Sequence, residues 1–197
     1  MKKIIFATHN EHKLSEVRQI LEPLGYKVLS AGDLNLPDVE ETGMTFKDNA
    51  LLKAYAGYKH TSLPVLAEDT GLCIHALGDE PGIYTKRYAE QHGGFPKVFD
   101  VLAERMKDNP DKSAYFNCTM ALVIDETQAE VFEGIFRGDI LPAPRGVNGF
   151  GYDPVFVPKG YDKTVAELSE DEKNTISHRA LALKKVADFL SKNNHIL

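Results

Sequence analysis

The most constraining stretch of this sequence is residues 64–74, where two adjacent carboxylates, Glu68 and Asp69, lie between two short apolar runs. Short apolar runs bounded by turn-forming residues are typical of buried strands, and Gly71 lets the backbone turn tightly between them. Adjacent carboxylates at the end of a buried strand repel each other and favour a hard divalent cation such as Mg²⁺, which prefers carboxylate and phosphate oxygens. On this stretch alone, an acidic surface turn is an equally valid interpretation.

The length of 197 residues predicts one domain, residues 1–197, with a substantial core. A hydrophobic share of 43% and a charged share of 26% are ordinary for a globular protein. No apolar run approaches the ~20 residues that span a bilayer, so we expect no membrane partner. The N-terminal apolar run is too short for a signal peptide and is interpreted as a first strand.

The net charge of -6 argues against a nucleic-acid partner, because such proteins usually carry a basic face. It leaves room for a small phosphate-bearing substrate, which needs only a local cluster of cations or a metal. Cys73 and Cys118 lack CxxC spacing, so we expect buried, reduced thiols in a cytoplasmic protein. A disulfide between them is the less favoured alternative.

A first candidate phosphate site lies between the N-terminal strand and the helix that follows it. Residues 2–7 are predicted to form a strand. Leu14, Val17, Leu21 and Leu24 have the spacing of the apolar face of an amphipathic helix that Gly25 ends. Free N–H groups and the helix dipole point at the intervening turn, so Thr8, Asn10 and Lys13 are candidate phosphate ligands. Alternatively, Asn10 only caps the helix and Lys13 is solvated.

The remaining elements follow from periodicity and turn chemistry. We expect helices after residues 45 and 94, a hairpin formed by strands 115–124 and 129–137, and further strands at 26–30 and 155–157. A C-terminal helix is expected after a capping box formed by Ser169 and Glu172, and its apolar face consists of Leu183, Val186, Ala187 and Leu190. Residues 78–94 and 141–151, rich in Gly and Pro, are interpreted as loops. Polar residues recur at strand ends and helix starts, which predicts an α/β protein whose site lies along a sheet edge.

Three further features carry candidate chemistry. Asn49 and Lys53 are four residues apart, hence on one helix face, close to the acidic pair Glu40 and Glu41. Phe150 lies between two glycines and is either a stacking platform for a planar ligand or a core anchor at a loop end. His178 and Arg179 begin a helix, with Lys173 just before, where basic residues oppose the dipole unless an anionic or polar ligand compensates.

Five motifs taken together resemble one family, the inosine/xanthosine triphosphate pyrophosphatases, nearly end to end and in the right order. They are Ala7-Thr-His-Asn-x-x-Lys13, Glu40-Glu-Thr-Gly-x-Thr-Phe-x-x-Asn-Ala50, Ala67-Glu-Asp-Thr-Gly-Leu72, Gly149-Phe-Gly-Tyr-Asp-Pro154 and Glu172-Lys-Asn-x-x-Ser-His-Arg179. The resemblance implies a mixed α/β fold with flanking helices, two lobes around a nucleotide-binding cleft, and a homodimer. It implies hydrolysis of ITP, dITP or XTP to the monophosphate and pyrophosphate with Mg²⁺.

The resemblance also implies roles for individual residues. Asp69 is the catalytic acid/base position and, with Glu40, a metal ligand, while Thr70 contacts substrate. The residues expected to hold the phosphates are Thr8, His9, Asn10, Glu11, His12 and Lys13, with Lys53 and Lys173 offsetting phosphate charge. The residues expected at the nucleoside are Phe150, Gly151, Tyr152, Asp153, His178 and Arg179, the last two donating to the 6-oxo group that adenine lacks.

The sequence departs from the family pattern at three places: His9 stands where many relatives have Gly, Glu68-Asp69-Thr70 replaces a frequent Asp-Asp-Ser, and Thr85-Lys-Arg-Tyr88 replaces Ser-Ala-Arg-Tyr. The last change puts substrate contacts by Thr85 and Lys86 in doubt. Two other functions remain possible interpretations. One is a pyrophosphatase of modified pyrimidine triphosphates, and the other is a binding module without activity, which has no need for two acidic pairs beside a phosphate site.

Overall fold

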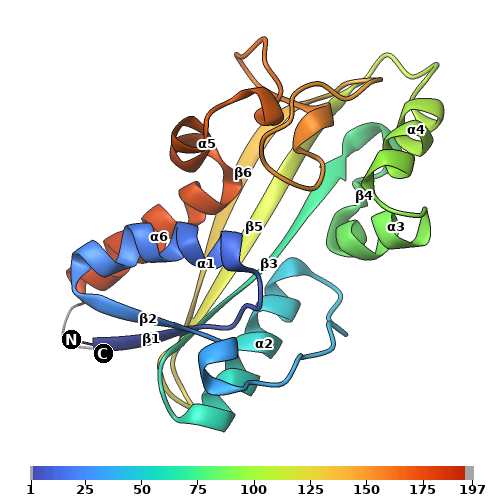
Figure 1. Cartoon of the computed structure of the whole chain (residues 1–197). Helices are drawn as coiled ribbons and strands as arrows, with labels where there is room; N and C mark the ends of the chain where they lie inside the picture. Colours follow the sequence, from blue (N-terminus) through green and yellow to red (C-terminus); the bar gives the residue numbers. More distant parts are fainter. Residues whose placement is uncertain (1, 194–197) are drawn as a thin grey trace. The chain divides into compact units, whose positions relative to one another are not determined.

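A computed structural model of the protein describes residues 2–193 (Figure 1). The helices are α1 (Glu11–Leu21), α2 (Phe46–Thr61), α3 (Thr85–Gln91), α4 (Phe95–Arg105), α5 (Glu170–Ile176) and α6 (His178–Lys192). The strands are β1 (Lys2–Phe6), β2 (Tyr26–Ser30), β3 (Val65–Ile74), β4 (Glu80–Pro81), β5 (Ser113–Val123), β6 (Ala129–Ile140) and β7 (Phe156–Pro158).

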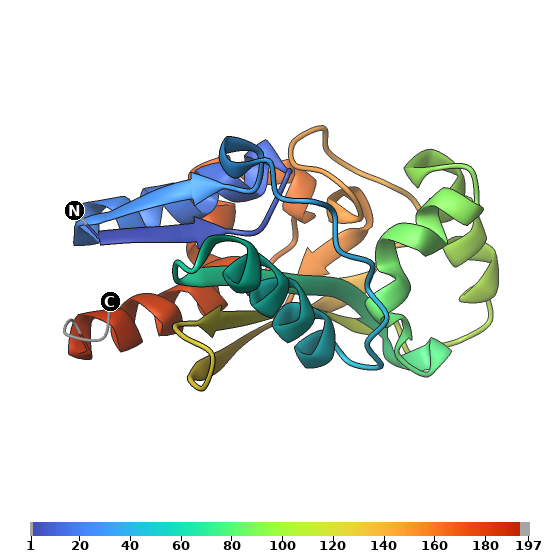
Figure 2. The same ribbon diagram turned by 90° about the horizontal axis from the view of Figure 1, so that it is seen from below.

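The strands of the described chain form one sheet of mixed direction, in the order β2-β1-β3-β5-β6-β7, with β4 paired to β3. β1 runs parallel to β2, with Ile4 opposite Val28, and parallel to β3. β7 runs antiparallel to β6, with Phe156 opposite Ile140. β1 and β2 lie side by side in both views (Figures 1 and 2). The predicted mixed α/β fold is therefore confirmed.

The described residues divide into two compact units. The first comprises residues 2–69, 118–134 and 179–193, and the second comprises residues 70–117 and 135–178. The strands β3, β5 and β6 each contribute residues to both units. The expected organisation as one domain stays a prediction.

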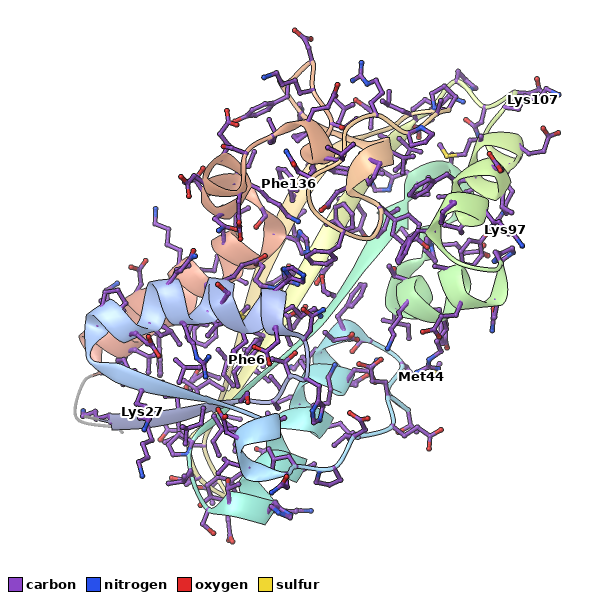
Figure 3. The ribbon with its side chains drawn as sticks, in the orientation of Figure 1. Phe6, Lys27, Met44, Lys97, Lys107 and Phe136 are labelled. Carbon is purple, nitrogen blue, oxygen red and sulfur yellow. The ribbon has the colours of Figure 1, made fainter. Side chains whose placement is uncertain are left out.

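The core of the first unit follows the two-residue period of its strands. Ile4 and Phe6 of β1 pack with α1 and α6, whereas Ile5 between them packs with α2. β5 alternates in the same way, with Met120 toward α1 and α6 and Ala121 toward α2. Within the unit, Phe6 is enclosed while Lys27 of β2 is exposed (Figure 3). Helices on both faces explain why these strands read as continuous apolar runs.

The core of the second unit is built around aromatic residues. Phe156 of β7 lies with its ring centroid 4.8 Å from that of Phe116 on β5 and 5.4 Å from that of Phe136 on β6. Tyr152 packs edge-on against Phe95 of α4, with ring centroids 5.1 Å apart, so the loop before β7 is tied to that helix. Tilted and edge-to-face contacts of this kind add to the free energy gained by burial.

Two sequence expectations were wrong. Residues 64–74 do not turn at Gly71, because β3 runs without a break from Val65 through Glu68 and Asp69 to Ile74. The predicted loop 78–94 contains β4 and the helix α3, which was missed because Gly and Pro near its ends hid a short seven-residue helix. Tertiary contacts override such local signals.

The other predicted elements form, but Leu24 was wrongly placed on the buried face of the first helix: α1 ends at Leu21, and Leu24 is 44% exposed in the 3-10 turn Glu22–Leu24 that contains Pro23. Asn10 caps α1, Ser169 and Glu172 form a capping box at α5, and Leu183, Val186 and Leu190 of α6 are buried. The hairpin strands lengthen to β5 and β6, and 141–151 is a loop without helix or strand. Cys73 and Cys118 are free and buried, as expected. Among residues 2–193, no helix is long and apolar enough to cross a membrane.

The contact between β6 and β7 predicts a strong effect of adding one methyl group. A Cβ on Gly138 would lie 2.2 Å from the Val157 carbonyl oxygen and 2.7 Å from Phe156 Cζ. We expect Gly138→Ala to reduce the free energy of unfolding by about 3 kcal/mol, because backbone cannot yield cheaply to such a clash. Gly32→Ala is the control, since its Cβ would meet only Ser30 Oγ at 3.5 Å. Equal melting temperatures for the two variants would contradict the register of β7.

Candidate active site

Strand geometry separates the two adjacent carboxylates of β3. Successive side chains of a strand point to opposite faces. Leu66 packs with α1 and α6, and Glu68 faces the same way; Ala67 packs with the α2 cluster, and Asp69 faces α2. Glu68 and Asp69 therefore do not face one shared cation. Each has its own set of positively charged and hydrogen-bonding partners on its own face of the strand.

Glu68 is the centre of a buried charge network. The Arg179 guanidinium donates from Nε to Glu68 Oε2 at 2.8 Å and from Nη2 to Glu68 Oε1 at 2.9 Å. Its Nη1 donates to Glu16 Oε2 at 2.9 Å, and Lys13 Nζ lies 2.7 Å from Glu68 Oε1. The Cys118 thiol donates to Glu68 Oε2 at 3.5 Å. Two carboxylates thus balance two cations in a site where Arg179 is only 1% exposed.

This network controls the ionisation of its members. Burial by itself would raise the pKa of Glu68, but the charges of Arg179 and Lys13 outweigh burial and hold that pKa well below its usual value of 4.5. Burial also raises the pKa of the Cys118 thiol well above its usual value, and the Glu68 charge adds to this effect. Glu68 is therefore an anion near neutral pH, and Cys118 is a neutral thiol that does not act as a nucleophile.

The start of α1 presents the predicted phosphate residues in a different way from that expected. Asn10 Oδ1 accepts from the backbone N–H groups of His12 at 3.0 Å and Lys13 at 3.2 Å, so Asn10 is a helix cap. Thr8 Oγ1 accepts from the Asn10 N–H at 3.1 Å. Lys13 is held on Glu68 rather than solvated. His9, Asn10, Glu11 and His12 of this turn are exposed, and His9 Nε2 lies 3.3 Å from Asp38 Oδ1.

Asp69 faces α2 and belongs to a second cluster. The Asn49 Nδ2 donates to Asp69 Oδ2 at 2.9 Å, and Lys53 Nζ lies 3.8 Å from Asp69 Oδ1. The ammonium of Lys53 also contacts the Glu41 carboxylate. Asp69 is only 4% exposed, so its charge depends on these two partners of α2. The shared helix face of Asn49 and Lys53, predicted from their spacing, is thus the face that meets Asp69.

The expected metal ligand Glu40 is exposed, whereas its neighbour Glu41 lies at the Lys53 ammonium. The residues themselves give no sequence signal for choosing between the two adjacent glutamates, and only the family resemblance selected Glu40. Among residues 2–193, no group of three or more His, Cys, Asp or Glu side chains is arranged to hold a metal. The assignment of Glu40 and Asp69 as metal ligands stays a prediction.

In the second unit, Asp153 organises the loop that carries Phe150. Asp153 Oδ2 accepts from the Phe150 N–H at 2.9 Å and from Lys173 Nζ at 2.6 Å. Lys173 Nζ also lies 4.3 Å from the centroid of the Phe150 ring, and that ring is 39% exposed. Gly149 has φ +73°, and a Cβ there would lie 2.1 Å from Asp153 Oδ2. The loop thus holds an exposed ring with a cation against it, which suits stacking on a planar ligand.

Other predicted site residues of the second unit make hydrogen bonds or ring contacts within that unit. Tyr152 is buried and donates to the Thr85 carbonyl oxygen at 3.1 Å, and Gly151 has φ +66°. Thr70 donates to the Asn117 carbonyl oxygen at 2.7 Å. His178 stacks on Phe116 with ring centroids 4.8 Å apart. Their substrate contacts stay predictions.

Thr85, whose substrate contact was in doubt, has a structural role. Its hydroxyl accepts from the Leu72 N–H at 2.8 Å and donates to the Gly82 carbonyl oxygen at 2.6 Å. Thr85 therefore ties the start of α3 to β3. Glu16 was not singled out from the sequence, whereas Glu41, Glu68 and Asn49 were noted as candidates but were given no role of their own at the site. Their only sequence signals are the acidic pairs for Glu41 and Glu68 and the four-residue spacing for Asn49.

This mixed α/β protein has two buried carboxylates on β3, a lysine of α1 or α2 against each of them, and an exposed aromatic ring on a loop, and such groups suit phosphates and a planar group. Comparisons with known proteins agree. The Ham1 family model matches residues 4–189. A dITP/XTP pyrophosphatase of Bacillus licheniformis is 46% identical over 195 residues, covering 98% of this chain and 100% of the relative. One of Bacillus subtilis is 46% identical over 193 residues, covering 96% and 98%.

Solved structures show the same relationship. A HAM1 protein of Coxiella burnetii matches with a TM-score of 0.92 and 39% identity over 98% of this chain and 100% of that chain. The Ham1 protein of Staphylococcus aureus matches with a TM-score of 0.88 and 36% identity over 97% and 99%. This chain belongs to the Ham1 family, and the resemblance stated from its five motifs is confirmed.

The Glu68 network predicts a specific dependence of stability on pH. Because the folded-state pKa of Glu68 is lowered, its charge stabilises the fold fully above about pH 4.5, and this stabilisation is lost as pH falls through the folded-state pKa. We expect Glu68→Gln to reduce the free energy of unfolding by about 3 kcal/mol at pH 7, since Arg179 loses its buried anion. Urea unfolding from pH 7 to 3 should show this difference narrowing only below about pH 4.5.

The exposed Glu126→Gln is the matched control, and we expect it to change stability little at any of these pH values. A Glu68→Gln difference that stays constant down to pH 3 would show that Glu68 is not the charged centre of the network.

Proposed function

We propose that this chain hydrolyses the deaminated purine nucleoside triphosphates ITP, dITP and XTP to the monophosphate and pyrophosphate, which removes them from the nucleotide pool. The relatives described above are dITP/XTP pyrophosphatases at 46% identity over nearly their whole length. The observation that carries the proposal is Asp69, a buried carboxylate held by the Asn49 amide beside the Lys53 ammonium.

The residues of the first unit suit the chemistry at the phosphates. Water attacks the α-phosphorus, the bond from that phosphorus to the oxygen bridging to the β-phosphorus breaks, and pyrophosphate leaves. Asp69 orients the water and accepts its proton. A triphosphate carries about four negative charges, which repel an attacking nucleophile, and the ammonium groups of Lys13 and Lys53 offset that charge. The ion pair with Glu68 holds the Lys13 ammonium in a fixed position, from which it would contact the phosphates.

The donor set fits Mg²⁺ as cofactor. Mg²⁺ is commonly held by one or two carboxylates and completes its shell with substrate phosphates and water. Asp69 and the acidic pair Glu40 and Glu41 would supply such oxygens, and the proposal is supported by Lys53, whose ammonium already lies near the carboxylates of both Glu41 and Asp69. When bound, Mg²⁺ would neutralise phosphate charge in the transition state. Thr8, His9, Asn10, Glu11 and His12 remain candidates for the phosphates through the turn before α1.

The residues of the second unit suit recognition of the base. The exposed Phe150 ring offers a face for a purine, with Lys173 and Asp153 fixing the loop. Gly151 and Tyr152 shape the same loop, and Thr70 and His178 complete the proposed contacts. Hydrogen-bond donors at this position would bind the 6-oxo group of hypoxanthine or xanthine. They would leave the 6-amino group of adenine without a hydrogen-bond partner. The Arg179 guanidinium is engaged by Glu68 and Glu16, so its geometry favours a structural role over the base contact proposed for it from sequence.

The proposal also includes the location, the oligomeric state and the partners of the protein. Free, buried Cys73 and Cys118 suit a reducing, cytoplasmic location. A homodimer without nucleic-acid or membrane partners is proposed from the family resemblance, and light scattering of the purified protein would measure the oligomeric state.

Asp69→Asn tests the reaction. We expect pyrophosphate release from ITP, dITP and XTP by the wild type, only with Mg²⁺, and much slower release from GTP and ATP. In Asp69→Asn, kcat should fall at least about 10³-fold, since an amide cannot accept the proton. The exposed Asp100→Asn is the matched control and should retain the wild-type rate. Near wild-type kcat in Asp69→Asn would overturn the assignment, and wild-type inactivity toward every nucleotide would overturn the function.

Phe150→Ala tests the stacking platform. Base stacking on an aromatic ring contributes about 1–3 kcal/mol, so we expect KM for ITP to rise on the order of 10-fold or more with kcat changed less. Phe150→Tyr keeps a ring and should restore most of the affinity. Tyr161→Ala removes another exposed aromatic side chain and should leave KM unchanged. An unchanged KM in Phe150→Ala would exclude stacking.

A further inference from the structure

The Asn49 side chain joins two parts of the first unit that sequence reasoning did not connect. Asn49 lies in the first turn of α2 and is 1% exposed. Its Nδ2 donates to Asp69 Oδ2 on β3 at 2.9 Å. Its Oδ1 accepts from the backbone N–H of Gly43 at 2.8 Å, in the segment that precedes the helix. A single buried amide therefore bonds both the proposed catalytic carboxylate and the segment that carries Glu41.

The Gly43 contact determines which way the Asn49 amide points. A backbone N–H can only donate, so the atom of Asn49 that faces Gly43 must be the acceptor Oδ1. The NH₂ group then necessarily faces Asp69, and Asp69 Oδ2 must accept. Gly43 thus acts through the amide on Asp69. A proton on Asp69 Oδ2 would weaken the hydrogen bond from Asn49, so the arrangement favours Oδ1 as the atom that takes a proton from water.

The fit around Gly43 leaves little freedom for this arrangement. A Cβ on Gly43 would lie 2.6 Å from Asp48 Cβ and 2.7 Å from Asn49 Oδ1. The adjacent Met44 is 80% exposed and projects from the segment (Figure 3), whereas Gly43 and the helix cap Thr45 on either side of it contact the start of α2. Two residues before Gly43, the Glu41 carboxylate contacts Lys53, which also approaches Asp69 Oδ1 at 3.8 Å. Asn49 and Lys53 therefore each contact both the segment and Asp69.

We propose that Asn49 is a positioning residue for the hydrolysis reaction, orienting Asp69 through a hydrogen bond to Oδ2 whose direction is set by the Gly43 N–H. Asn49 need not touch substrate; it acts through Asp69. The inference rests on the proposed function, because it assigns Asn49 a part in that reaction. It predicts a loss in kcat with little change in KM, since the orientation of the reacting group changes while phosphate and base contacts persist.

The isosteric variant Asn49→Asp separates the two hydrogen bonds. At this position an ionised aspartate can still accept from the Gly43 N–H but offers no donor to Asp69, and a proton shared between the two carboxylates would take from Asp69 the free negative charge that a general base needs. We expect kcat for ITP to fall about 100-fold, KM to change less than about 3-fold, and hydrogen exchange of the Gly43 amide to stay protected. Asn49→Ala should lose kcat to a similar degree and also lose protection at Gly43. The exposed Asn35→Asp controls for the added charge and should match the wild type.

Each outcome decides the proposal. Wild-type kcat in Asn49→Asp would overturn it. A loss of kcat in Asn49→Ala alone would also overturn it, because Asn49 would then act through Gly43 and not through Asp69. If the Gly43 amide loses its protection from hydrogen exchange in Asn49→Asp, kcat is measured for Asn49→Ser as well. A wild-type kcat in Asn49→Ser would then overturn the proposal. Failure of the proposed function is distinct, since the wild type itself would then not release pyrophosphate from ITP, dITP or XTP.

Discussion

The first unit depends on the contact between the Arg179 guanidinium and the Glu68 carboxylate. Arg179 belongs to α6, Glu68 to β3 and Glu16 to α1, so one side chain joins three elements that are far apart in the sequence. A charge taken out of water is costly unless it is paired and hydrogen-bonded. The two parallel hydrogen bonds from Arg179 to Glu68 fix both distance and angle, which a Lys at this position would not do. The network therefore specifies how α6 and α1 pack on the strand.

The same network leaves Asp69 available for chemistry. Glu68 pairs with Lys13 of α1 and Arg179 of α6. Because side chains alternate along β3, Asp69 faces the opposite way, toward Asn49 of α2. Adjacent residues of one strand thus differ in the proposed function: Glu68 has a structural role and Asp69 a chemical one. Asp69 is held by an amide donor instead of by a bidentate guanidinium. A hydrogen bond from a neutral side-chain amide orients a carboxylate without neutralising its charge. A general base has to retain this negative charge to accept a proton.

The second unit uses a carboxylate in a third way. Asp153 accepts from the Phe150 N–H and from Lys173, so a single side chain fixes the loop backbone and places a cation against the aromatic ring. Gly149 is required there because Asp153 Oδ2 occupies the space where any Cβ would lie. An exposed ring on a loop held in this way needs little reordering when it binds a planar group, so less free energy is lost on binding.

The sequence by itself determined the fold class, the family and most elements, because hydrophobic periodicity, caps and the five ordered motifs are local properties of the chain. Asn10 as a cap, the α6 apolar face and the Asn49–Lys53 face could all be predicted from spacing. Only the tertiary structure decided that β3 continues through Gly71, that Glu41 and not Glu40 meets Lys53, and that Arg179 is buried on Glu68 and Glu16. The physical reason is that a buried charge is stable only with its partners, and here those partners come from distant segments: Glu68 lies 111 residues and Glu16 163 residues from Arg179.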